Sequence, residues 1–141
     1  MIKTDETKSG ARRVGVSFGV RGQCLVPEFV STLLGIPATR QFSKGDSHDT
    51  HSGPMTRPFG VWAIDSDSFL DSESIEEHAT FILGKIEPCR QQVRNLLEDD
   101  KLRVFVAIWW EPEGGQGGFT LKAATISRLA SLANEVDFYF A

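Results

Sequence analysis

The chain has 141 residues, of which 40% are hydrophobic and 24% are charged, and its formal net charge is −4. This composition is typical of a globular protein with one core and excludes a disordered chain. No stretch approaches the roughly 18 consecutive apolar residues that a membrane-spanning helix needs. The negative charge disfavours binding to nucleic acid or to an anionic membrane and favours a basic partner.

Residues 1–10 are polar and aperiodic, which predicts a disordered tail before a single domain over residues 11–141. The tail has no apolar segment of the kind that secretory signals carry. Two cysteines, Cys24 and Cys89, do not indicate a disulfide framework. We therefore expect a cytoplasmic protein whose thiols are reduced and buried or partly buried.

The first regular element is a strand over residues 12–21, in which apolar residues alternate with Gly15, Ser17 and Gly19. A period of two describes a half-buried strand, and its second face is unusually bare. Residues 26–34 then follow helical spacing, with Pro27 suited to the first turn and Gly35 to the left-handed end.

The middle of the chain alternates between irregular and regular segments. Residues 38–42 predict a brief strand, and residues 41–58 a long polar loop, which in a compact domain is usually functional or mobile. A strand over residues 59–64 carries Trp62. Next, Ser74 and Glu77 form a capping box at the start of a helix.

The last part of the chain predicts a second helical piece, three strands and a final helix. Pro88 opens the helical piece, and the strand over residues 102–110 is apolar on nearly both faces, so that it is central in the sheet or covered twice. A glycine-rich hairpin connection at 114–118 leads to a short strand at 119–121. A last helix then ends at Asn134 and precedes a terminal strand.

These elements predict an α+β fold, with a mainly antiparallel sheet covered on one face by amphipathic helices. Several connections are too short for parallel crossovers, and a ferredoxin-like arrangement is one form that such a sheet can take. One core is expected to contain the following apolar residues: Val14, Val16, Phe18, Val104, Val106, Ile108, Leu129 and Phe138.

Several short motifs are similar to those of the bacterial domain-of-unknown-function 4279 family. They are Leu34-Gly35-Ile36-Pro37-Ala38-Thr39-Arg40, Lys44-Gly45-Asp46, Gly60-Val61-Trp62, Asp65-Ser66, Glu77-His78, Ile86-Glu87-Pro88 and Val136-Asp137-Phe138-Tyr139. The resemblance spans residues 12–140 and implies a single α+β domain in a bacterial cytoplasm, with no established activity. Small bacterial proteins of this kind are often toxin-neutralising immunity proteins, which is an analogy and not chemistry.

Catalytic and metal-binding patterns are weak in this sequence. His48, Asp49 and His51, with Asp46 nearby, offer metal ligands, but their spacing matches no known site, and we expect no metal and no cofactor. His78 is interpreted as a hydrogen-bonded boundary histidine rather than a catalytic base. The glycine run is not followed by the Lys-Ser/Thr pair of a phosphate-binding loop.

Two features remain as candidate binding surfaces. The first is the polar segment that contains Arg40, Lys44, Asp46, Asp49 and Arg57, although an Arg40–Asp46 ion pair that only pins the loop would explain it equally well.

The second candidate surface is the flat strip formed by Gly15, Ser17 and Gly19. The aromatic residues that could lie beside it, at alternating strand positions, are Trp62, Trp109 and Tyr139. The alternative is that the aromatic rings pack over the glycines inside the protein. A flat aromatic face can, however, also bind a protein partner or a second copy of the chain.

The leading hypothesis is a non-enzymatic protein-binding module that inhibits a basic toxin domain. Its expected contact residues are Trp62, Trp109, Asp46, Asp49, Arg40, Arg57 and Glu111. The alternative is a small enzyme or ligand-binding domain with a pocket under the 41–58 loop. That pocket would use His48, His51, Asp46 and Arg57.

Overall fold

The computed structural model describes residues 11–112 and 117–140. The strands and helices, in chain order, are β1 (Ala11–Gly22), α1 (Pro27–Leu34), β2 (Arg40–Phe42), β3 (Ser47–Thr50), β4 (Gly53–Thr56), β5 (Gly60–Asp65), α2 (Ile75–Ile86), α3 (Arg90–Leu97), β6 (Arg103–Pro112), α4 (Ala123–Ala130) and β7 (Glu135–Tyr139). Short 3₁₀ turns occupy Ser66–Ser68 (η1) and Glu87–Cys89 (η2). The expected tail over residues 1–10 and most of the expected hairpin at 114–118 lie outside the described residues.

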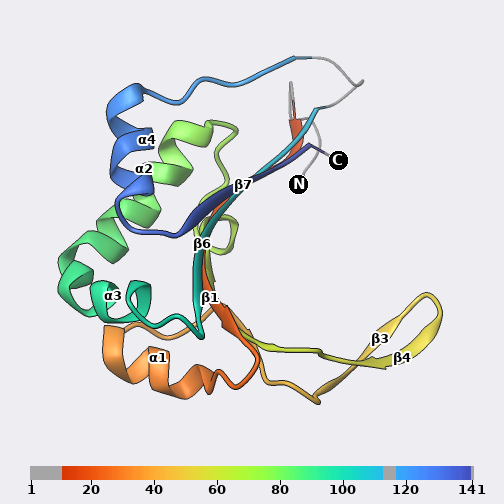
Figure 1. Cartoon of the computed structure of the whole chain (residues 1–141). Helices are drawn as coiled ribbons and strands as arrows, with labels where there is room; N and C mark the ends of the chain where they lie inside the picture. Colours follow the sequence, from red (N-terminus) through yellow and green to blue (C-terminus); the bar gives the residue numbers. More distant parts are fainter. Residues whose placement is uncertain (1–10, 113–116, 141) are drawn as a thin grey trace.

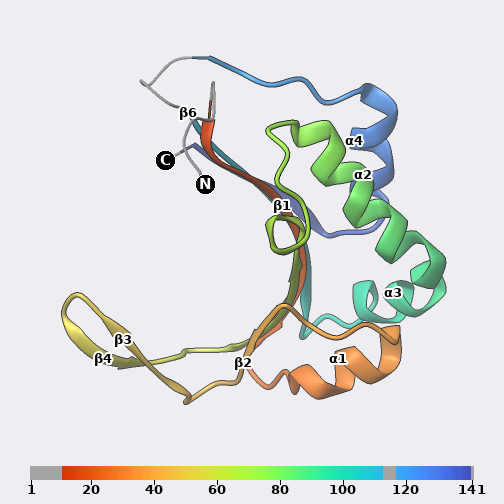
Figure 2. The same ribbon diagram turned by 180° about the vertical axis from the view of Figure 1, so that it is seen from behind.

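The sheet contains five strands in the order β2-β5-β1-β6-β7, and β3 pairs with β4 in a separate hairpin. All neighbouring strands of the larger sheet are antiparallel except β6 and β7. The four α-helices lie on one side of it (Figures 1 and 2). The predicted α+β class, with a mainly antiparallel sheet and helices on one face, is confirmed.

The strands β1, β2, β5 and β6, together with the helices that connect them, have the ferredoxin-like order. β5 lies between β1 and β2, the two strands that α1 connects, and β1 lies between β5 and β6, the two strands that α2 and α3 connect. Both units are therefore split β-α-β units, and together they give the strand order β2-β5-β1-β6. α4 and β7 extend this arrangement, because β7 is added beside β6 and runs parallel to it.

The hydrophobic core lies between the sheet and the helices. Its strand residues include Val16, Phe18, Val20, Trp62, Ile64, Val104, Val106 and Ile108, and its helix residues include Val30, Ile75, Ala79, Ile82, Leu83, Val93, Leu96 and Leu129. Val14 is only partly buried against this cluster. Phe138 was expected in the core, but it is 51% exposed because β7 forms the outer edge of the sheet.

The helices begin and end largely where their local signals predict. The Ser74 hydroxyl accepts a hydrogen bond from the Glu77 amide, which caps α2, and Gly35 ends α1 in the left-handed conformation at φ 70°. Gly84 does not interrupt α2, which continues to Ile86. Pro88 lies in η2, directly before α3. The described chain contains no helix that is both long and apolar enough to cross a membrane.

Three local expectations are wrong. Most of the expected 41–58 loop is the β3–β4 hairpin, in which Gly53 turns the chain at φ 106°. Residues 119–121 are irregular and not a strand. Asn134 does not cap α4, because its backbone amide and its side-chain carbonyl both bond the backbone of Val104.

Candidate functional site: the uncovered face of the sheet

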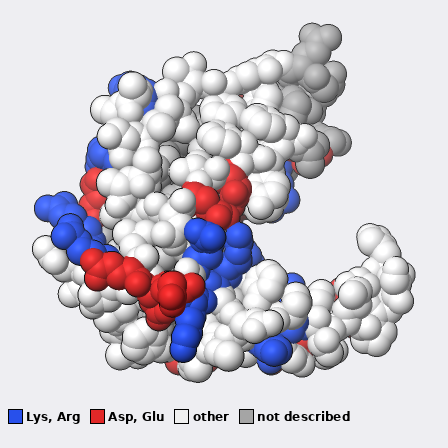
Figure 3. All heavy atoms as spheres, viewed as in Figure 1, with Lys and Arg blue, Asp and Glu red and all other residues white. Residues whose placement is uncertain are grey.

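One face of the five-stranded sheet carries no helix of the described chain. In the space-filling view the molecule is C-shaped, and this face lines the hollow between the β3–β4 hairpin and the opposite end of the sheet (Figure 3). In Figure 1 this face is the side of the sheet opposite the helices. We call it the uncovered face. Side chains of both charge signs lie next to one another beside it (Figure 3).

The glycines of β1 are covered by side chains of other segments. Gly15 faces Trp109 across the β1–β6 pair, but the atoms nearest to a Cβ placed on it belong to Asp67 and Ser66 of η1. Gly19 faces Phe105. A Cβ on Gly19 would lie 2.3 Å from the Phe105 ring, so this ring lies flat over the glycine. Ser17 is only 2% exposed. The strip is therefore a site of internal packing and not bare, and the accessible surface consists of the groups that lie over it.

An aromatic stack forms one end of the uncovered face. Trp109 of β6 lies on Tyr139 of β7, with ring centroids 4.2 Å apart and planes inclined by 15°. The Arg13 guanidinium sits 4.2 Å from the centroid of the Trp109 ring, where a cation interacts favourably with the π electrons. The predicted place of Trp109 beside Gly15 is confirmed, and Tyr139 lies one strand further away, against Trp109.

Asp65 is the centre of a hydrogen-bond network on the same face. Its carboxylate accepts bonds from Ser17 Oγ at 2.5 Å, from Thr39 Oγ1 at 2.8 Å and from the Arg40 guanidinium at 2.9 and 3.2 Å. Partial burial opposes ionisation of Asp65, but the bonds from Arg40, Ser17 and Thr39 outweigh it and hold its pKa below the usual value. The negative charge of this carboxylate is thus fixed at neutral pH.

A small cavity of about 280 Å³ opens beside this network. It is lined by Arg13, Ser17, Arg40, Asp65, Asp67 and Trp109. The lining contains two guanidinium groups and two carboxylates, and the Arg40–Asp65 pair already satisfies one of each. Because the lining charges balance, the cavity carries no net charge that would attract a free ion.

A second set of charges lies toward the β7 edge. Glu135 accepts from Arg21 at 2.8 Å and lies 3.4 Å from Arg103. Partial burial and the neighbouring Glu135 carboxylate hold the pKa of Asp137 above its usual value, although Arg21 opposes the shift. The Arg21 guanidinium also lies 5.5 Å from the Phe105 ring centroid. The arginine side chains Arg13, Arg21 and Arg40 on the uncovered face are thus already held in place by stacking or pairing.

The expected position of Trp62 on this surface is wrong. Trp62 faces the helices, is fully buried, and donates its indole N–H to Ser31 Oγ on α1 at 2.9 Å. It packs edge to face with Phe18 of the core. The β5 sequence is apolar on both faces, so its periodicity does not show which side of the sheet Trp62 occupies.

The charged side chains of the 40–58 segment do not form one cluster. Arg40 bonds Asp65, so the alternative Arg40–Asp46 ion pair is wrong, and Asp46 instead accepts from the Ser43 amide at 2.8 Å. Arg57 lies 3.9 Å from the centroid of the Phe42 ring. Asp49 is exposed on β3, in the hairpin that projects from the body of the molecule (Figure 1).

Glu111 and Lys44 occupy opposite parts of the chain. Glu111 lies on β6, directly across from Arg13 at the end of the uncovered face. Lys44 is exposed in the turn between β2 and β3. The structure therefore brings Trp109, Arg40 and Glu111 to the uncovered face, and it leaves Asp46, Asp49 and Lys44 in or beside the hairpin.

The histidines of the hairpin do not gather with other ligands. His48 lies in β3 opposite Met55, and His51 lies in the turn that follows. Over residues 11–112 and 117–140, no group of three or more His, Cys, Asp or Glu side chains is placed to hold a metal ion. Cys24 is exposed, contrary to expectation, while burial raises the pKa of the half-buried Cys89 thiol.

A buried Ser–His pair joins three elements of the fold. The Val16 amide donates to Ser66 Oγ at 2.8 Å, and Ser66 Oγ is 2.6 Å from His78 Nδ1. His78 Nε2 lies 2.8 Å from the Ser72 carbonyl oxygen, which can only accept, so the proton is on Nε2 and Ser66 donates to Nδ1. Both side chains are fully buried, and the pair is structural. The expectation that His78 is hydrogen-bonded is confirmed, but its expected boundary position is wrong because the side chain is fully buried. No signal in the sequence identified Ser66.

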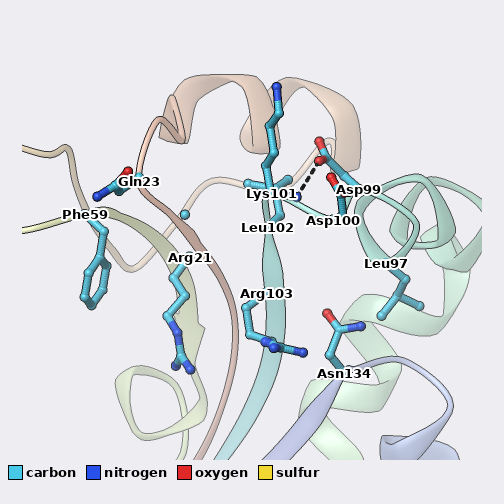
Figure 4. Close-up of a pocket in the computed structure, with 11 residues that line it drawn as sticks. Arg21, Gln23, Phe59, Leu97, Asp99, Asp100, Lys101, Leu102, Arg103 and Asn134 are labelled. Carbon is cyan, nitrogen blue, oxygen red and sulfur yellow. Dashed lines mark hydrogen bonds between the residues drawn. The ribbon is translucent and has the colours of Figure 1, made fainter.

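A larger cavity of about 500 Å³ lies at the end of the sheet where β6 begins. It is lined in part by Arg21, Lys101, Arg103 and Asn134. The positively charged side chains of this cavity do not point toward a common position. The Lys101 side chain points away from the guanidinium groups of Arg21 and Arg103 (Figure 4). Asp99 accepts from the Lys101 amide at 3.0 Å and thereby fixes the turn before β6. The cavity is therefore a surface depression in which no group of charged side chains is arranged to bind one ligand.

The fold and this surface define a class: an α+β domain whose sheet is covered by helices on one face and by its own stacked side chains on the other. The model of the family described as "Domain of unknown function (DUF4279)" matches residues 12–140. The chain belongs to this family. No curated protein and no solved structure matches it significantly.

Proposed function

We propose that this protein is a protein-binding module of the toxin-neutralising immunity type, and that the uncovered face is its contact surface. The observation that carries the proposal is the Trp109–Tyr139 stack with Arg13 beside it, on a concave face that no helix of the described chain covers. Tryptophan, tyrosine and arginine are the residues most enriched among the energetically dominant contacts of protein interfaces.

Pre-organisation supports the same function. Ring stacking and ion pairs already restrict Arg13, Arg21 and Arg40 in the free protein. A partner therefore immobilises fewer rotamers when it binds, and the entropic cost of association is lower. A broad, rigid surface of this kind favours a folded protein partner over a small substrate that must be enclosed.

Charge favours a basic partner. The chain carries a formal net charge of −4, and Asp46, Asp49 and Glu111 lie around the hollow rather than in its centre. Peripheral charges act mainly on the rate of association. Neutralising these three carboxylates should slow association with a basic toxin domain and weaken its salt dependence, with a smaller effect on dissociation.

The test begins with the product of the neighbouring gene, purified as a candidate toxin. Its affinity for the wild-type protein and for Trp109→Ala is measured by calorimetry. We expect the substitution to weaken binding by roughly 30-fold, which corresponds to about 2 kcal/mol. In cells, co-expression of the wild-type protein should restore growth in the presence of the toxin, and Trp109→Ala should restore it less.

Phe29→Ala is the matched control. Phe29 is a 56% exposed aromatic on α1, on the helix side of the molecule, so its loss should leave affinity unchanged. Equal affinities for Trp109→Ala and wild type would place the contact on another surface. If the wild-type protein neither binds the neighbouring product nor protects against it, the immunity function is wrong.

A further inference from the structure

The strand β7 forms one edge of the five-stranded sheet and pairs, within the described residues, only with β6. An edge strand presents unpaired backbone N–H and C=O groups that can pair with another chain. At the other edge, β2 has only three residues, whereas β7 has five. Of the two edges, β7 therefore offers the longer strand for pairing.

Exposed aromatic residues accompany this edge on both faces. Phe138 is 51% exposed, Tyr139 42% and Phe140 62%. The Phe138 and Phe140 rings are nearly parallel, at 4°, with centroids 6.4 Å apart, and Tyr139 stacks on Trp109. Edge strands are usually protected by charges, proline or a bulge. In β7 the charges of Glu135 and Asp137 lie on one face only, and large exposed aromatics such as Phe138 on the other face of an edge indicate an interface.

We infer that β7 pairs with β7 of a second copy of this chain, antiparallel, around a two-fold axis at Phe138. Pairing an edge strand with its own copy is self-complementary and closes after two subunits. The inference is independent of the proposed toxin-neutralising function.

The acidic residues of β7 select this register. A two-fold axis at Val136 would place Glu135 opposite Asp137, and an axis at Asp137 would place two Asp137 carboxylates opposite each other. Like charges directly opposite each other destabilise a strand pair. Burial and Glu135 already disfavour the Asp137 charge, so another carboxylate would add to that cost.

An axis at Phe138 avoids this repulsion. It places Asp137 opposite Tyr139, whose hydroxyl can donate to the carboxylate, and it places Phe138 opposite its own copy and Val136 opposite Phe140. Moving the axis to Tyr139 would pair Phe138 with Phe140 and would remove the contact between Asp137 and the Tyr139 hydroxyl. The register at Phe138 thus combines the absence of opposed carboxylates with that contact.

The resulting dimer has a defined geometry. Antiparallel edge pairing joins the two five-stranded sheets and leaves the helices of both copies on one side. The two uncovered faces then lie on the other side and form one continuous surface. Trp109 and Tyr139 of both copies stand close to the axis of that surface, because they lie at the β6–β7 edge.

Analytical ultracentrifugation over a series of protein concentrations tests the dimer. We expect a concentration-dependent dimer for the wild type and a monomer for Phe138→Lys, because a lysine at the axis meets its own copy. Phe138 is half exposed, so circular dichroism should show an unchanged fold. Phe29→Lys, which places the same charge on α1, should remain dimeric. A wild type that stays monomeric, or a Phe138→Lys protein that stays dimeric, overturns the inference.

Disulfide formation tests the register. In a Cys24→Ser, Cys89→Ser background, Phe138→Cys places two thiols directly opposite each other, and oxidation should give a covalent dimer. Asp137→Cys places its thiols two residues out of register, beyond the Cα separation of about 7 Å that a disulfide tolerates. Preferential cross-linking of Asp137→Cys would refute the axis at Phe138.

Discussion

The two faces of the sheet show two ways to cover the same strands. On one face, β1 and β6 present Val16, Phe18 and Val106 to the helices, and aliphatic packing excludes water. On the other face, the same strands present Gly19 and Phe105, and the ring lies flat over the glycine. The first face needs separate elements to cover it, whereas the second is covered by its own side chains.

The difference has an energetic consequence. The helix-covered face derives its stability from apolar burial, which contributes about 25 cal/mol per Å² removed from water. The uncovered face adds stacking and charge pairs that remain near solvent and contribute less per group. Substitutions on the helix-covered face should therefore damage the fold most, and substitutions on the uncovered face should affect local geometry first.

The largest expected effect is that of Val106→Asp on the helix-covered face. Val106 is fully buried in the core, and an aspartate there would bury an unpaired charge. We expect a loss of more than about 4 kcal/mol in the free energy of unfolding, enough to unfold the domain. Circular dichroism measures this directly. A native spectrum with an unchanged melting temperature would contradict the position of β6 in the core.

Trp62→Ala should have the next largest effect. It would leave a cavity between β5 and α1 and would remove the indole hydrogen bond to Ser31. Loss of a buried tryptophan typically costs about 3–5 kcal/mol. Urea unfolding measures the change, and Trp109→Ala on the uncovered face is the comparison. If both substitutions cost the same, the two faces do not differ as we describe.

Gly19→Ala tests whether the Phe105 ring lies over β1 on the uncovered face. The added Cβ would lie 2.3 Å from the Phe105 ring, so the ring must move, at a cost of about 1–3 kcal/mol. In a Phe105→Ala background the same substitution should cost much less, because the obstructing ring is gone. Additive effects in this double-mutant cycle would show that Phe105 does not lie over Gly19.

Gly84→Ala is the control for the glycine substitution. Gly84 lies within α2, and a Cβ there meets no atom within 4 Å. Alanine is favoured over glycine within a helix by about 1 kcal/mol. We therefore expect Gly84→Ala to raise the melting temperature while Gly19→Ala lowers it.

The smallest expected loss of stability is that of Asp65→Asn, which should cost about 1–2 kcal/mol at neutral pH. The folded pKa of Asp65 lies below its ordinary value of 3.8, so its contribution is complete above that pH and is lost as the pH falls through the folded pKa. Urea unfolding at several pH values should show the wild type and Asp65→Asn converging only below about pH 4. A constant difference down to the lowest pH would contradict this assignment.

The sequence predicted the elements whose signals are local. The alternation in β1, the Ser74 cap and Gly35 each follow from neighbouring residues, and the structure has them in place. The edge position of Phe138 could not be inferred in this way, because strand order depends on contacts between segments far apart in the sequence. Alternation in β7 identified a strand but not its neighbours.

The candidate surface was predictable only in part. Trp109 was expected beside Gly15, and the β1–β6 register places it there. The covering of Gly19 by Phe105 depends on the same register, which no local pattern in either strand specifies. The β3–β4 hairpin was missed because its residues are polar and include Pro54, which disfavours strand assignment.

The β3–β4 hairpin has consequences for the dynamics of the molecule. It forms a two-stranded sheet of its own, and a hairpin of this size has little independent stability. Its amides should therefore exchange with solvent by local opening, at rates that do not follow global unfolding, while the amides of β1 and β6 exchange only when the whole domain unfolds. The hairpin that borders one side of the hollow should therefore change its conformation without unfolding of the five-stranded sheet, which would let partners of different width fit against the uncovered face.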